Sequence, residues 1–409
     1  MELFSKQRIV LGVSGSIAAY KAVYLASRLT QAGALVDVVL SEAAGKLVNP
    51  ISFSSVTGRK TFRDEDLWEA SEHVPHIELG ENNDLFLIAP ATANTIAKLA
   101  NGAADNLLSL SALASRTPVH LAPAMDGGMY AHPATQENLR ILTERGAVVL
   151  GPAQGHLASG LKGKGRMIEP EELLGHIRLA LGREGLLAGK RVVVTAGGTR
   201  EAIDPVRYLS NRSSGKQGYA LAQAALDQGA EVVLITAPTR LHAPIGAKTI
   251  SVVSAAEMFD AVLGEADRAD LLIMAAAVAD FQPEQPAEQK IKKAQDELLT
   301  LALRPTKDIL REVARRKSSS GKGPRFTVGF AAESERLIEQ AEKKLKAKSL
   351  DIIAVNDISR SDAGFAVDTN QVTLLRQDGT IRELPLMSKA EVAREIILEA
   401  AGFFGSPAG

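Results

Sequence analysis

The chain has 409 residues, about twice the usual domain length of roughly 100–200 residues, which favours two domains that each bury a core of their own. Hydrophobic residues make up 45% and charged residues 23%, and Lys+Arg 47 nearly balance Asp+Glu 48 for a formal net charge of -1. This balance excludes a global field that would recruit nucleic acid or an anionic membrane, so any phosphate binding has to come from local loops.

The chain contains no cysteine, which excludes disulfides and thiolate metal sites and favours the cytoplasm as its location. The opening residues, MELFSKQRIVLGVSG, predict a first strand that ends in glycines and not a signal peptide. No apolar run is long enough to span a bilayer, so no membrane partner is expected.

The first half begins with a β-loop-α-β unit. An apolar strand over Arg8–Val13 leads into glycines, a helical pattern over Ile17–Gln31 follows, and a second strand covers Ala34–Leu40. The alternation continues with helices between further expected strands at Leu85–Ala89, Val119–Ala122 and Ala147–Leu150.

The second half repeats this order from Lys190 onward. A strand over Arg191–Thr195 precedes two glycines, a helix over Tyr219–Gln228 follows, and the next strand covers Glu231–Thr236. Later strands are expected at Leu271–Ala275, Thr327–Gly329, Ile352–Val355 and Gln371–Arg376. The pattern predicts an α/β protein with two doubly wound Rossmann-like domains, each with a mainly parallel sheet covered by helices.

The boundary is expected in the stretch Gly182–Gly189, which gives domains 1–186 and 187–409. A second irregular stretch, Arg316–Gly323, reads RKSSSGKG and is interpreted as a mobile surface loop, with a phosphate-binding loop as the alternative.

Two glycine-rich loops are candidates for anion binding. Gly12–Ser16 joins a strand to a helix N-terminus, where free N–H groups and the helix dipole favour phosphate, although a plain tight turn would read the same. The dinucleotide fingerprint and the P-loop motif are both absent, which weakens NAD and P-loop interpretations. In the second half, Thr199–Lys216 is dense in basic side chains and predicts an anionic substrate, with a solvated basic loop as the alternative.

Several separate motifs of the first half resemble the cysteine-decarboxylating flavoprotein family. They are GVSGSIAAYK, SEAA at Ser41–Ala44, HIEL at His76–Leu79, APATANTIAKLANGAADNLL at Ala89–Leu108 and PAMDGGMY at Pro123–Tyr130. The second half is similar to phosphopantothenate–cysteine ligases through TAGGTREAIDPVRYLSNRSSGKQG, MAAAVADF, KIKK, VGFAAES and KLKAKSLDIIAVND. In this order the motifs resemble the bifunctional family that fuses phosphopantothenoylcysteine decarboxylase to this ligase.

The resemblance implies two coupled steps of coenzyme A biosynthesis. The C-terminal domain would activate 4'-phosphopantothenate with CTP and Mg²⁺ as an acyl-cytidylate and join it to cysteine, because a free carboxylate resists attack by an amine. The N-terminal domain would then decarboxylate the product to 4'-phosphopantetheine, with FMN as the cofactor that turns the thiol into a thioaldehyde and so supplies an electron sink. The family also implies a homo-oligomer, since its flavin sites lie between subunits.

By the same resemblance, FMN would be bound by five residues, Gly15, Ser16, Ser41, Asn94 and Thr95. His76 would be the base or the substrate-orienting residue, although His73 is nearby and an isolated histidine before an apolar strand is usually structural. In the ligase, Asn211 would stabilise the acyl-cytidylate with Arg207 nearby. The residues expected around CTP are Met274, Ala275, Ala276, Asp280, Lys290, Phe330, Lys344 and Lys348. No metal ligands are assigned.

Two positions depart from the family pattern, and both are in the decarboxylase. Asp126 stands where the family carries Asn, so an ionised carboxylate would repel the substrate carboxylate unless it is held neutral. Ser159 stands where the family often has a cysteine that protonates the final enethiolate, and a hydroxyl is a much weaker acid than a thiol. We expect net decarboxylation to persist. The alternatives are a ligase joined to an impaired FMN-binding scaffold, and an NAD(P)-dependent oxidoreductase.

Overall fold

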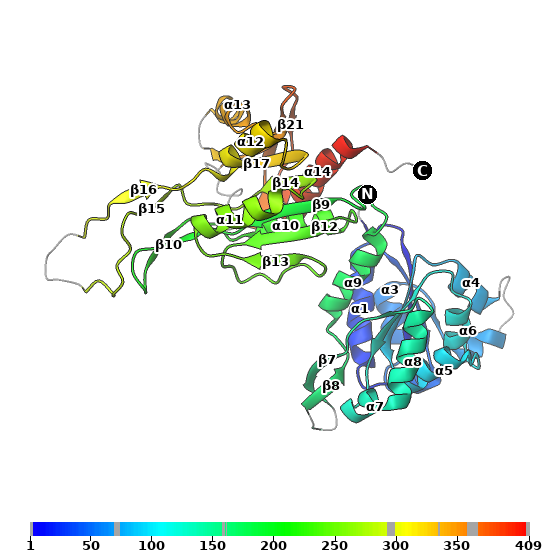
Figure 1. The fold of residues 1–409 in the computed structure, drawn as a ribbon. Coiled ribbons are helices and arrows are strands. Elements are labelled where there is room, and N and C mark those ends of the chain that lie inside the picture. The colour runs from blue at the N-terminus through cyan, green and yellow to red at the C-terminus, as the bar shows by residue number, and fades with distance from the viewer. Residues whose placement is uncertain are drawn as a thin grey trace. The chain divides into compact units, whose positions relative to one another are not determined.

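The computed structural model describes residues 3–68, 74–157, 160, 162–292, 299–333, 336–357 and 367–405. The chain forms two compact units, residues 1–181 and residues 182–409 (Figure 1). Each unit is built around one large sheet.

The sheet of the first unit has six strands in the order β3-β2-β1-β4-β5-β6, and every neighbouring pair is parallel. Its strands are β1 (Arg8–Val13), β2 (Leu35–Leu40), β3 (Thr61–Phe62), β4 (Leu85–Ala91), β5 (Val119–Pro123) and β6 (Val148–Val149). Its helices are α1 (Ala19–Gln31), α2 (Glu42–Gly45), α3 (Pro50–Thr57), α4 (Pro75–Glu81), α5 (Ala93–Asn101), α6 (Leu107–Leu113), α7 (Gly127–Ala131), α8 (Pro133–Glu144) and α9 (Pro170–Gly182), with a 3₁₀ helix η1 (Asp64–Trp68) and a hairpin of β7 (Ala153–His156) and β8 (Lys162–Arg166).

Both faces of this sheet are buried because its strands carry apolar residues on both sides. Ile9 and Leu11 of β1 pack in a core with Leu25 of α1, which also takes in side chains of α3 and α9. Val10, between them, points to the opposite core, where it meets Ile96 of α5 and side chains of α4, α6 and α8. This three-layer arrangement is the doubly wound form that the sequence predicts.

The sheet of the second unit has eight strands in the order β13-β12-β9-β14-β17-β18-β20-β21. The pairs from β13 to β18 are parallel, and β20 and β21 are added antiparallel at one edge. These strands are β9 (Arg191–Ala196), β12 (Glu231–Thr236), β13 (Lys248–Ser251), β14 (Leu271–Met274), β17 (Phe326–Glu333), β18 (Ile352–Asp357), β20 (Val372–Arg376) and β21 (Ile381–Glu383). Three two-stranded ribbons join β10 (Arg200–Ala202) to β11 (Tyr208–Ser210), β15 (Phe281–Pro283) to β16 (Leu303–Pro305), and β19 (Thr369–Asn370) to β22 (Met387–Ser388).

Helices cover both faces of this sheet as well. α11 (Ala255–Ala266), α12 (Ile309–Ser320) and α13 (Leu337–Ala347) share one core with alternate strand residues. α10 (Lys216–Leu226) and α14 (Lys389–Ala401) pack against each other, and the chain continues into a short 3₁₀ helix, η2 (Gly402–Phe404). The mainly parallel, helix-covered sheet expected from the sequence is present in both units.

The interpretation of Arg316–Gly323 as a mobile loop is wrong for most of its length. Helix α12 continues to Ser320 and ends at Gly321, whose φ of +67° closes the helix in the left-handed region. Glu312 pairs with both Arg315 and Arg316 on the next turn of the helix, and such i,i+3 and i,i+4 ion pairs stabilise a helix.

Strand order reverses at one place in each sheet. β1 lies between β2 and β4, and β9 lies between β12 and β14, so helices leave these neighbouring strand ends toward opposite faces. A crevice forms outside the carboxyl ends of the strands at such a switch point, and open α/β sheets bind their ligands there. In each sheet, the glycine-rich loop identified in the sequence follows the strand at the switch point, which is β1 in the first unit and β9 in the second.

Candidate functional site

The first unit carries a cavity of about 800 Å³ at its switch point, within the size range of roughly 300–1,000 Å³ that small-molecule sites occupy. The loops after β1, β2, β4 and β5 form its walls, together with strand β8 of the hairpin. Six residues singled out from the sequence line it, namely Gly15, Ser16, Ser41, Asn94, Thr95 and Asp126.

Gly15 allows the loops after β1 and β2 to approach each other closely. A Cβ built on Gly15 would lie 2.4 Å from Ala43 Cβ and 3.2 Å from the Ala43 carbonyl carbon, so a larger residue does not fit without movement. The loop is also tied to β4, because Ser14 Oγ donates to the Pro90 carbonyl at 2.7 Å and accepts from the Thr92 N–H at 2.9 Å. The backbone of this loop, which is expected to bind phosphate, is therefore held tightly in place.

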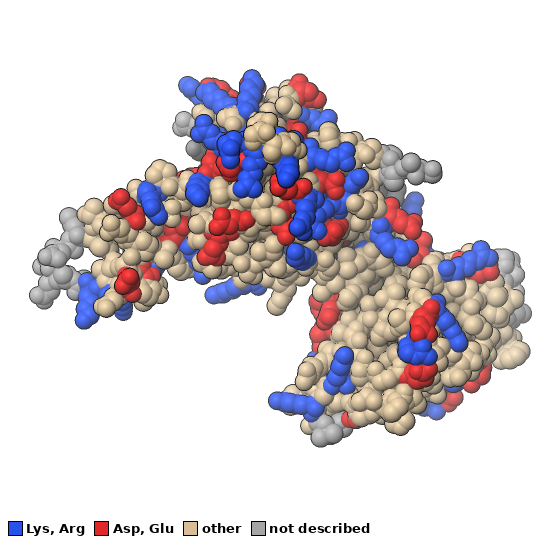
Figure 2. Space-filling view, in the orientation of Figure 1, with Lys and Arg blue, Asp and Glu red and all other residues tan. Residues whose placement is uncertain are grey.

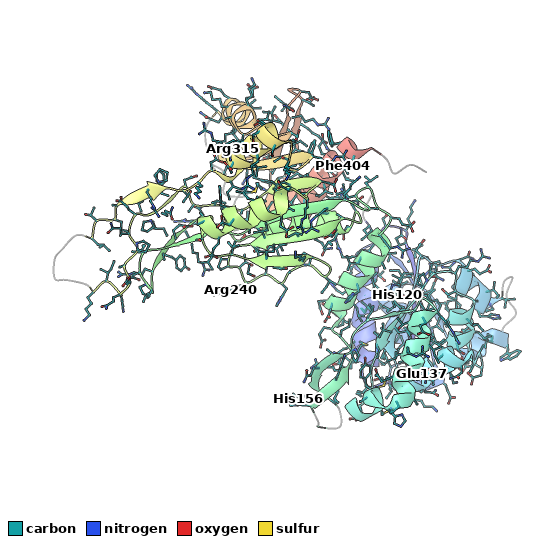
Figure 3. All side chains as sticks on the ribbon, viewed as in Figure 1. His120, Glu137, His156, Arg240, Arg315 and Phe404 are labelled. Carbon is teal, nitrogen blue, oxygen red and sulfur yellow. The ribbon has the colours of Figure 1, made fainter. Side chains whose placement is uncertain are left out.

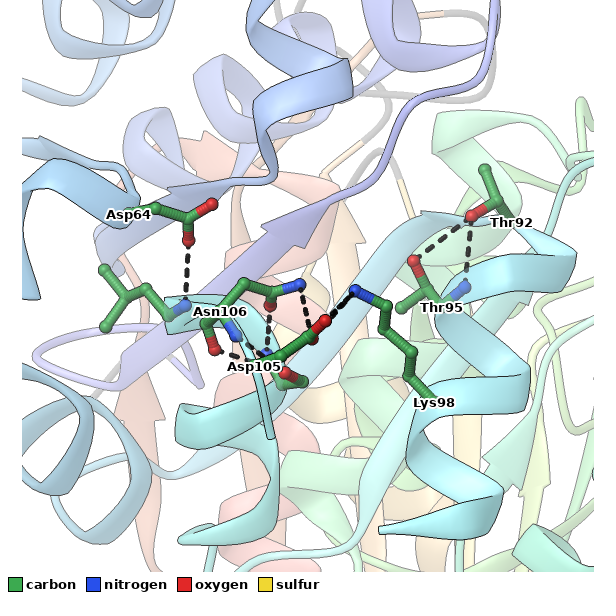
Figure 4. A network of polar contacts seen from close by, with 8 residues as sticks. Asp64, Thr92, Thr95, Lys98, Asp105 and Asn106 are labelled. Atoms are coloured by element: carbon green, nitrogen blue, oxygen red, sulfur yellow. Dashed lines mark hydrogen bonds and ion pairs between the residues drawn. The ribbon is translucent and has the colours of Figure 1, made fainter. Parts of the chain in front are cut away.

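Helix starts surround the cavity. Ser41 caps α2 by accepting the Ala44 N–H, and Thr92 caps α5 by accepting the Thr95 N–H, each at 3.3 Å. The hydroxyls of Thr92 and Thr95 lie 3.1 Å apart (Figure 4). N–H groups and hydroxyls thus gather at the end of the cavity where the sequence predicts the FMN phosphate and loop contacts.

A second polar network holds the wall formed by α5 and α6 (Figure 4). Lys98 Nζ lies 2.7 and 2.8 Å from the two carboxylate oxygens of Asp105. Asp64, on η1, accepts the Leu107 N–H at 2.8 Å, and Asn106 caps α6 by accepting the Ser109 N–H at 2.9 Å. The motif APATANTIAKLANGAADNLL includes Lys98 and Asp105, but only the fold brings Asp64 beside them.

Lys21 was not among the residues predicted from the sequence, although it ends the motif GVSGSIAAYK. Its side chain lines the cavity and is buried, and its ammonium group pairs with Glu169 at 2.9 Å. Glu169 also pairs with Arg166 of β8 at 2.5 Å, and both cations hold the pKa of this carboxyl below its usual value. The contact links helix α1 to the hairpin strand that forms the opposite wall.

Asp126 caps α7, with one carboxylate oxygen accepting the Gly128 N–H at 2.9 Å. This contact needs only an acceptor, which the side-chain oxygen of an asparagine would equally supply. Ser159 lies outside the described residues, so the structure does not test its role. Strand β7, which precedes Ser159 in the chain, contributes His156 to the cavity, and Figure 3 shows His156 at an edge of the unit.

His76 does not line this cavity. It lies in α4, near the exposed side chains of Val74 and Ile77, and its Nδ1 atom is buried with no hydrogen-bond partner among the described residues. A buried ring nitrogen without a hydrogen-bond partner costs free energy in a folded protein. The described residues around His76 do not supply this hydrogen bond.

The second unit carries a cavity of about 500 Å³ at its own switch point. The carboxyl ends of β14, β17 and β18 and the first turn of α10 form its walls. Seven of the residues expected around CTP line it, namely Met274, Ala275, Ala276, Asp280, Phe330, Lys344 and Lys348.

Backbone contacts fix the segment after β14. Thr195 Oγ1 accepts the Ala276 N–H at 3.1 Å and contacts Met274 Sδ at 3.7 Å. Asn211 Nδ2 donates to the carbonyls of Ala277 and Val278 at 3.1 and 3.4 Å. Asn211 therefore holds the cavity wall but is not itself part of the cavity lining.

Lys344 and Lys348 share one side of α13, as their i,i+4 spacing predicts, and both line the cavity. Lys348 pairs with Asp308 at 3.2 Å, which is the residue that caps helix α12. The cavity is therefore bordered by helix ends and basic side chains, a combination that suits a phosphate-bearing ligand.

Arg207 and Lys290 do not line the cavity. The guanidinium of Arg207 pairs with Asp204 at 2.5 Å and donates to the Ile291 carbonyl at 2.8 Å. The hydrogen bonds from Arg207, together with backbone N–H groups, hold the pKa of Asp204 far below its usual value. Lys290, next to Ile291, is exposed. These two basic residues lie together but away from the other expected CTP residues of the same chain.

Acidic and basic side chains are intermingled on the visible face of each unit, with uncharged areas around them (Figure 2). Within the ranges that the structure describes, no group of three or more His, Cys, Asp or Glu residues could hold a metal ion. In the same ranges, no helix has the length and hydropathy needed to cross a membrane. Mg²⁺ commonly uses one or two carboxylates together with substrate phosphates, and Asp280 and Asp308 border the second cavity.

Comparison with known proteins gives matches to both halves. Residues 2–181 match the model of the family described as Flavoprotein, and residues 187–403 match the DNA/pantothenate metabolism flavoprotein C-terminal domain. The chain is 46% identical over 402 residues to the coenzyme A biosynthesis bifunctional protein CoaBC of Bacillus subtilis, covering 98% of each chain. It is 43% identical to the protein of the same name from Mycobacterium tuberculosis, covering 96% of this chain and 95% of that one.

A crystal structure of the C-terminal domain of a coenzyme A biosynthesis bifunctional protein CoaBC aligns at 39% identity and a TM-score of 0.45, covering 54% of this chain and 98% of that one. The identity extends over nearly the whole length of the bifunctional relatives and includes both of their domains. This chain therefore belongs to the family of bifunctional enzymes of coenzyme A biosynthesis, in which a flavoprotein decarboxylase domain is fused to a ligase domain.

Proposed function

We propose that residues 1–186 form an FMN-dependent decarboxylase of 4'-phosphopantothenoylcysteine and residues 187–409 form the CTP-dependent ligase that makes this compound from 4'-phosphopantothenate and cysteine. The observation that carries the proposal is the pair of cavities, one at the switch point of each sheet, each lined by most of the residues expected for its reaction. Nothing in the described residues favours a first unit that serves only as a scaffold.

In the decarboxylase, the close contact of Gly15 with Ala43 and the helix starts at Ser41 and Thr92 suit the phosphate of FMN. Ser16, Asn94 and Thr95 would complete the cofactor contacts. Bound FMN would accept the electrons of the thiol oxidation that makes loss of CO₂ possible. Asp126, held at the start of α7, would position the substrate, and Lys21 would keep the hairpin wall in place through Glu169.

Anaerobic incubation with 4'-phosphopantothenoylcysteine tests the decarboxylase and the consequence of Asp126 and Ser159. We expect CO₂ release and 4'-phosphopantetheine, with oxidised flavin at the end of the reaction. Accumulation of the enethiol with bleached flavin, and no 4'-phosphopantetheine, would show that the last protonation fails in this chain.

In the ligase, Phe330 and the Met274–Ala276 segment would bind the base and ribose of CTP, and Lys344 and Lys348 would neutralise its phosphates. Asn211 would act on the acyl-cytidylate from the wall that it holds through Ala277 and Val278. Asp280 and Asp308 would hold Mg²⁺, which would neutralise charge on the phosphates of CTP.

The ligase half is tested by incubating the enzyme with 4'-phosphopantothenate, cysteine and Mg²⁺ and comparing CTP with ATP. We expect release of CMP and pyrophosphate in a one-to-one ratio with the adduct. Faster turnover with ATP would contradict the assignment of CTP.

We further propose that the enzyme is a homo-oligomer and works in the cytoplasm, which the absence of cysteine supports. His76 lies off the flavin cavity of its own chain, beside the exposed apolar residue Ile77 and two residues from the exposed Val74. A second copy would bring its His76 to the cavity. Mixing an inactive His76→Asn variant with an inactive Asn94→Asp variant tests this, because only a site shared between copies regains decarboxylase activity in mixed oligomers.

A further inference from the structure

A third cavity, of about 560 Å³, adjoins the flavin cavity of the first unit. Helix α7 forms one wall, and strand β8 of the hairpin forms another. Asp126 and Leu157 line both cavities, so the two lie next to each other. Residues assigned to the cofactor, such as Ser41 and Asn94, line the first cavity and not the third. The third cavity is therefore available to a part of the substrate that does not contact the flavin.

The hairpin beside this cavity carries positive charge. Residues 153–166 include Lys162, Lys164 and Arg166 and contain no Asp or Glu, and Figure 2 shows basic side chains on this hairpin. Arg166 pairs with Glu169, whereas neither lysine pairs with an acidic side chain among the described residues. Both lysines line the third cavity, and the described lining contains one acidic residue, Asp126. The lining therefore carries a net positive charge.

Glycines on β8 hold the two lysines beside α7. Lys162 and Lys164 are two residues apart, so they lie on one face of the strand, and Gly163 and Gly165 lie on the other. The Gly165 carbonyl accepts the Met125 N–H at 3.0 Å, and a Cβ on Gly165 would clash with the Met125 carbonyl oxygen. The backbone of β8 thus packs directly against the segment that leads into α7, which fixes the wall that carries the lysines.

Helix α7 adds a hydroxyl group next to Lys164. Lys164 Nζ lies 5.5 Å from the centre of the Tyr130 ring, a cation–π distance, and Tyr130 lines the cavity. Gln136 holds the backbone of Tyr130, because its Nε2 donates to the Tyr130 carbonyl at 2.5 Å. Ammonium groups and a phenolic hydroxyl are donors that bind phosphate oxygens. The cavity therefore offers both charge and hydrogen bonds to one anionic group.

The substrate of the proposed decarboxylase is elongated, and its phosphate is remote from its reacting end. The cysteinyl group has to reach the flavin, and two amide bonds separate this group from the 4'-phosphate. With the cysteinyl end in the flavin cavity, the phosphate has to lie beyond that cavity. A phosphate monoester carries a charge of about −1.5 to −2 near neutral pH, which two ammonium groups balance.

Resting on the proposed decarboxylase function, we propose that the third cavity binds the 4'-phosphate of the substrate through Lys162, Lys164 and Tyr130. The cavity thereby selects the phosphorylated compound over the same compound without phosphate. These contacts are made far from the reacting carbon and are equally strong in the bound substrate and in the transition state. They therefore lower KM and leave kcat nearly unchanged.

The test uses the full-length, FMN-loaded enzyme and two substrates, 4'-phosphopantothenoylcysteine and pantothenoylcysteine, with CO₂ release giving kcat and KM for each. The double variant Lys162→Met with Lys164→Met should raise KM for the phosphorylated substrate by about 10-fold or more and KM for the other by less than about 2-fold. Arginine at both positions should recover part of the loss. Lys6→Met is the matched control, because Lys6 is exposed near the amino end of β1, at the opposite edge of the sheet.

An equal rise in KM for both substrates would show that the hairpin only shapes the flavin cavity, and would overturn the proposal. An unchanged preference for the phosphorylated substrate would overturn it too, as would the same loss in Lys6→Met, which would reflect net charge alone. Flavin content and thermal unfolding check each variant, and Lys162→Gln with Lys164→Gln replaces a double variant that does not fold. If the wild-type enzyme releases CO₂ from neither substrate, the decarboxylase function fails, whereas the ratio of the two KM values tests the lysines alone.

Discussion

Substitution of Gly15 by alanine tests the geometry of the flavin cavity through a single methyl group. The added Cβ would lie 2.4 Å from Ala43 Cβ, whereas ordinary contact begins at 3.4 Å, so one of the two loops has to move by about 1 Å. Forced movement of this kind costs about 1–3 kcal/mol. The displaced loops form the end of the site that is proposed to bind the FMN phosphate. If the binding free energy of FMN falls by the same amount, the affinity for FMN becomes about 5- to 150-fold weaker.

The control is Gly45→Ala in α2, close in sequence to Ala43, because no atom lies within 4 Å of the Cβ that this change adds. The two variants are compared by flavin absorbance after dialysis, by titration of the apoenzyme with FMN and by thermal unfolding. We expect Gly15→Ala to lose FMN and Gly45→Ala to keep it. If Gly15→Ala retains FMN with the affinity of Gly45→Ala, the cavity does not bind the cofactor through this loop.

Two further predictions concern stability. Asp37, whose side chain is 2% exposed, pairs with Arg8 and Arg59 at 2.7 Å each, so Asp37→Asn should lower the free energy of unfolding in urea by about 3 kcal/mol. Glu137→Gln, which removes an exposed pair with Arg140 (Glu137 is labelled in Figure 3), should change it by less than about 1 kcal/mol; equal effects would contradict the reasoning. Burial lowers the pKa of His176 on α9, so its neutral form contributes stability that is present above the unfolded pKa of about 6.5 and is lost as pH falls from there through the lower pKa of the folded state. His176→Gln should therefore lose less stability than the wild type over this pH range in urea titrations, and parallel curves would refute the assignment.

Much of the fold follows from patterns that act locally. The strands at Arg8–Val13 and Glu231–Thr236 have the bounds that their apolar runs predict, because a strand buried on both faces needs continuous apolar residues. Ser320 and Gly321 show the limit of this approach, since a polar composition concealed a helix whose ion pairs and glycine end become evident only in three dimensions. Pairing order is likewise not local, and the antiparallel addition of β20 and β21 has no signal in their own residues.

The residues of the two candidate sites could likewise be predicted only in part from the sequence. Gly15, Ser41 and Phe330 line the cavities as expected. Their motifs lie at or near the carboxyl ends of parallel strands, and the sheet brings these strand ends together at one edge. Lys21 and Lys389, a buried lysine that lines the second cavity, were missed, since a lysine at the start or middle of a helix usually faces solvent and only packing shows otherwise. The capping pattern Ser388–Glu391 marks the helix start that places Lys389, but it carries no information about the cavity that this start faces.

The measurement that tests the account most directly is mass spectrometry of the products formed from 4'-phosphopantothenate, cysteine and CTP with Mg²⁺. Both cavities have to work in sequence for the final product to appear. We expect 4'-phosphopantetheine, with CMP, pyrophosphate and CO₂ as the other products and only transient 4'-phosphopantothenoylcysteine. An adduct that accumulates and never loses CO₂ would contradict the two-step function and leave only the ligase.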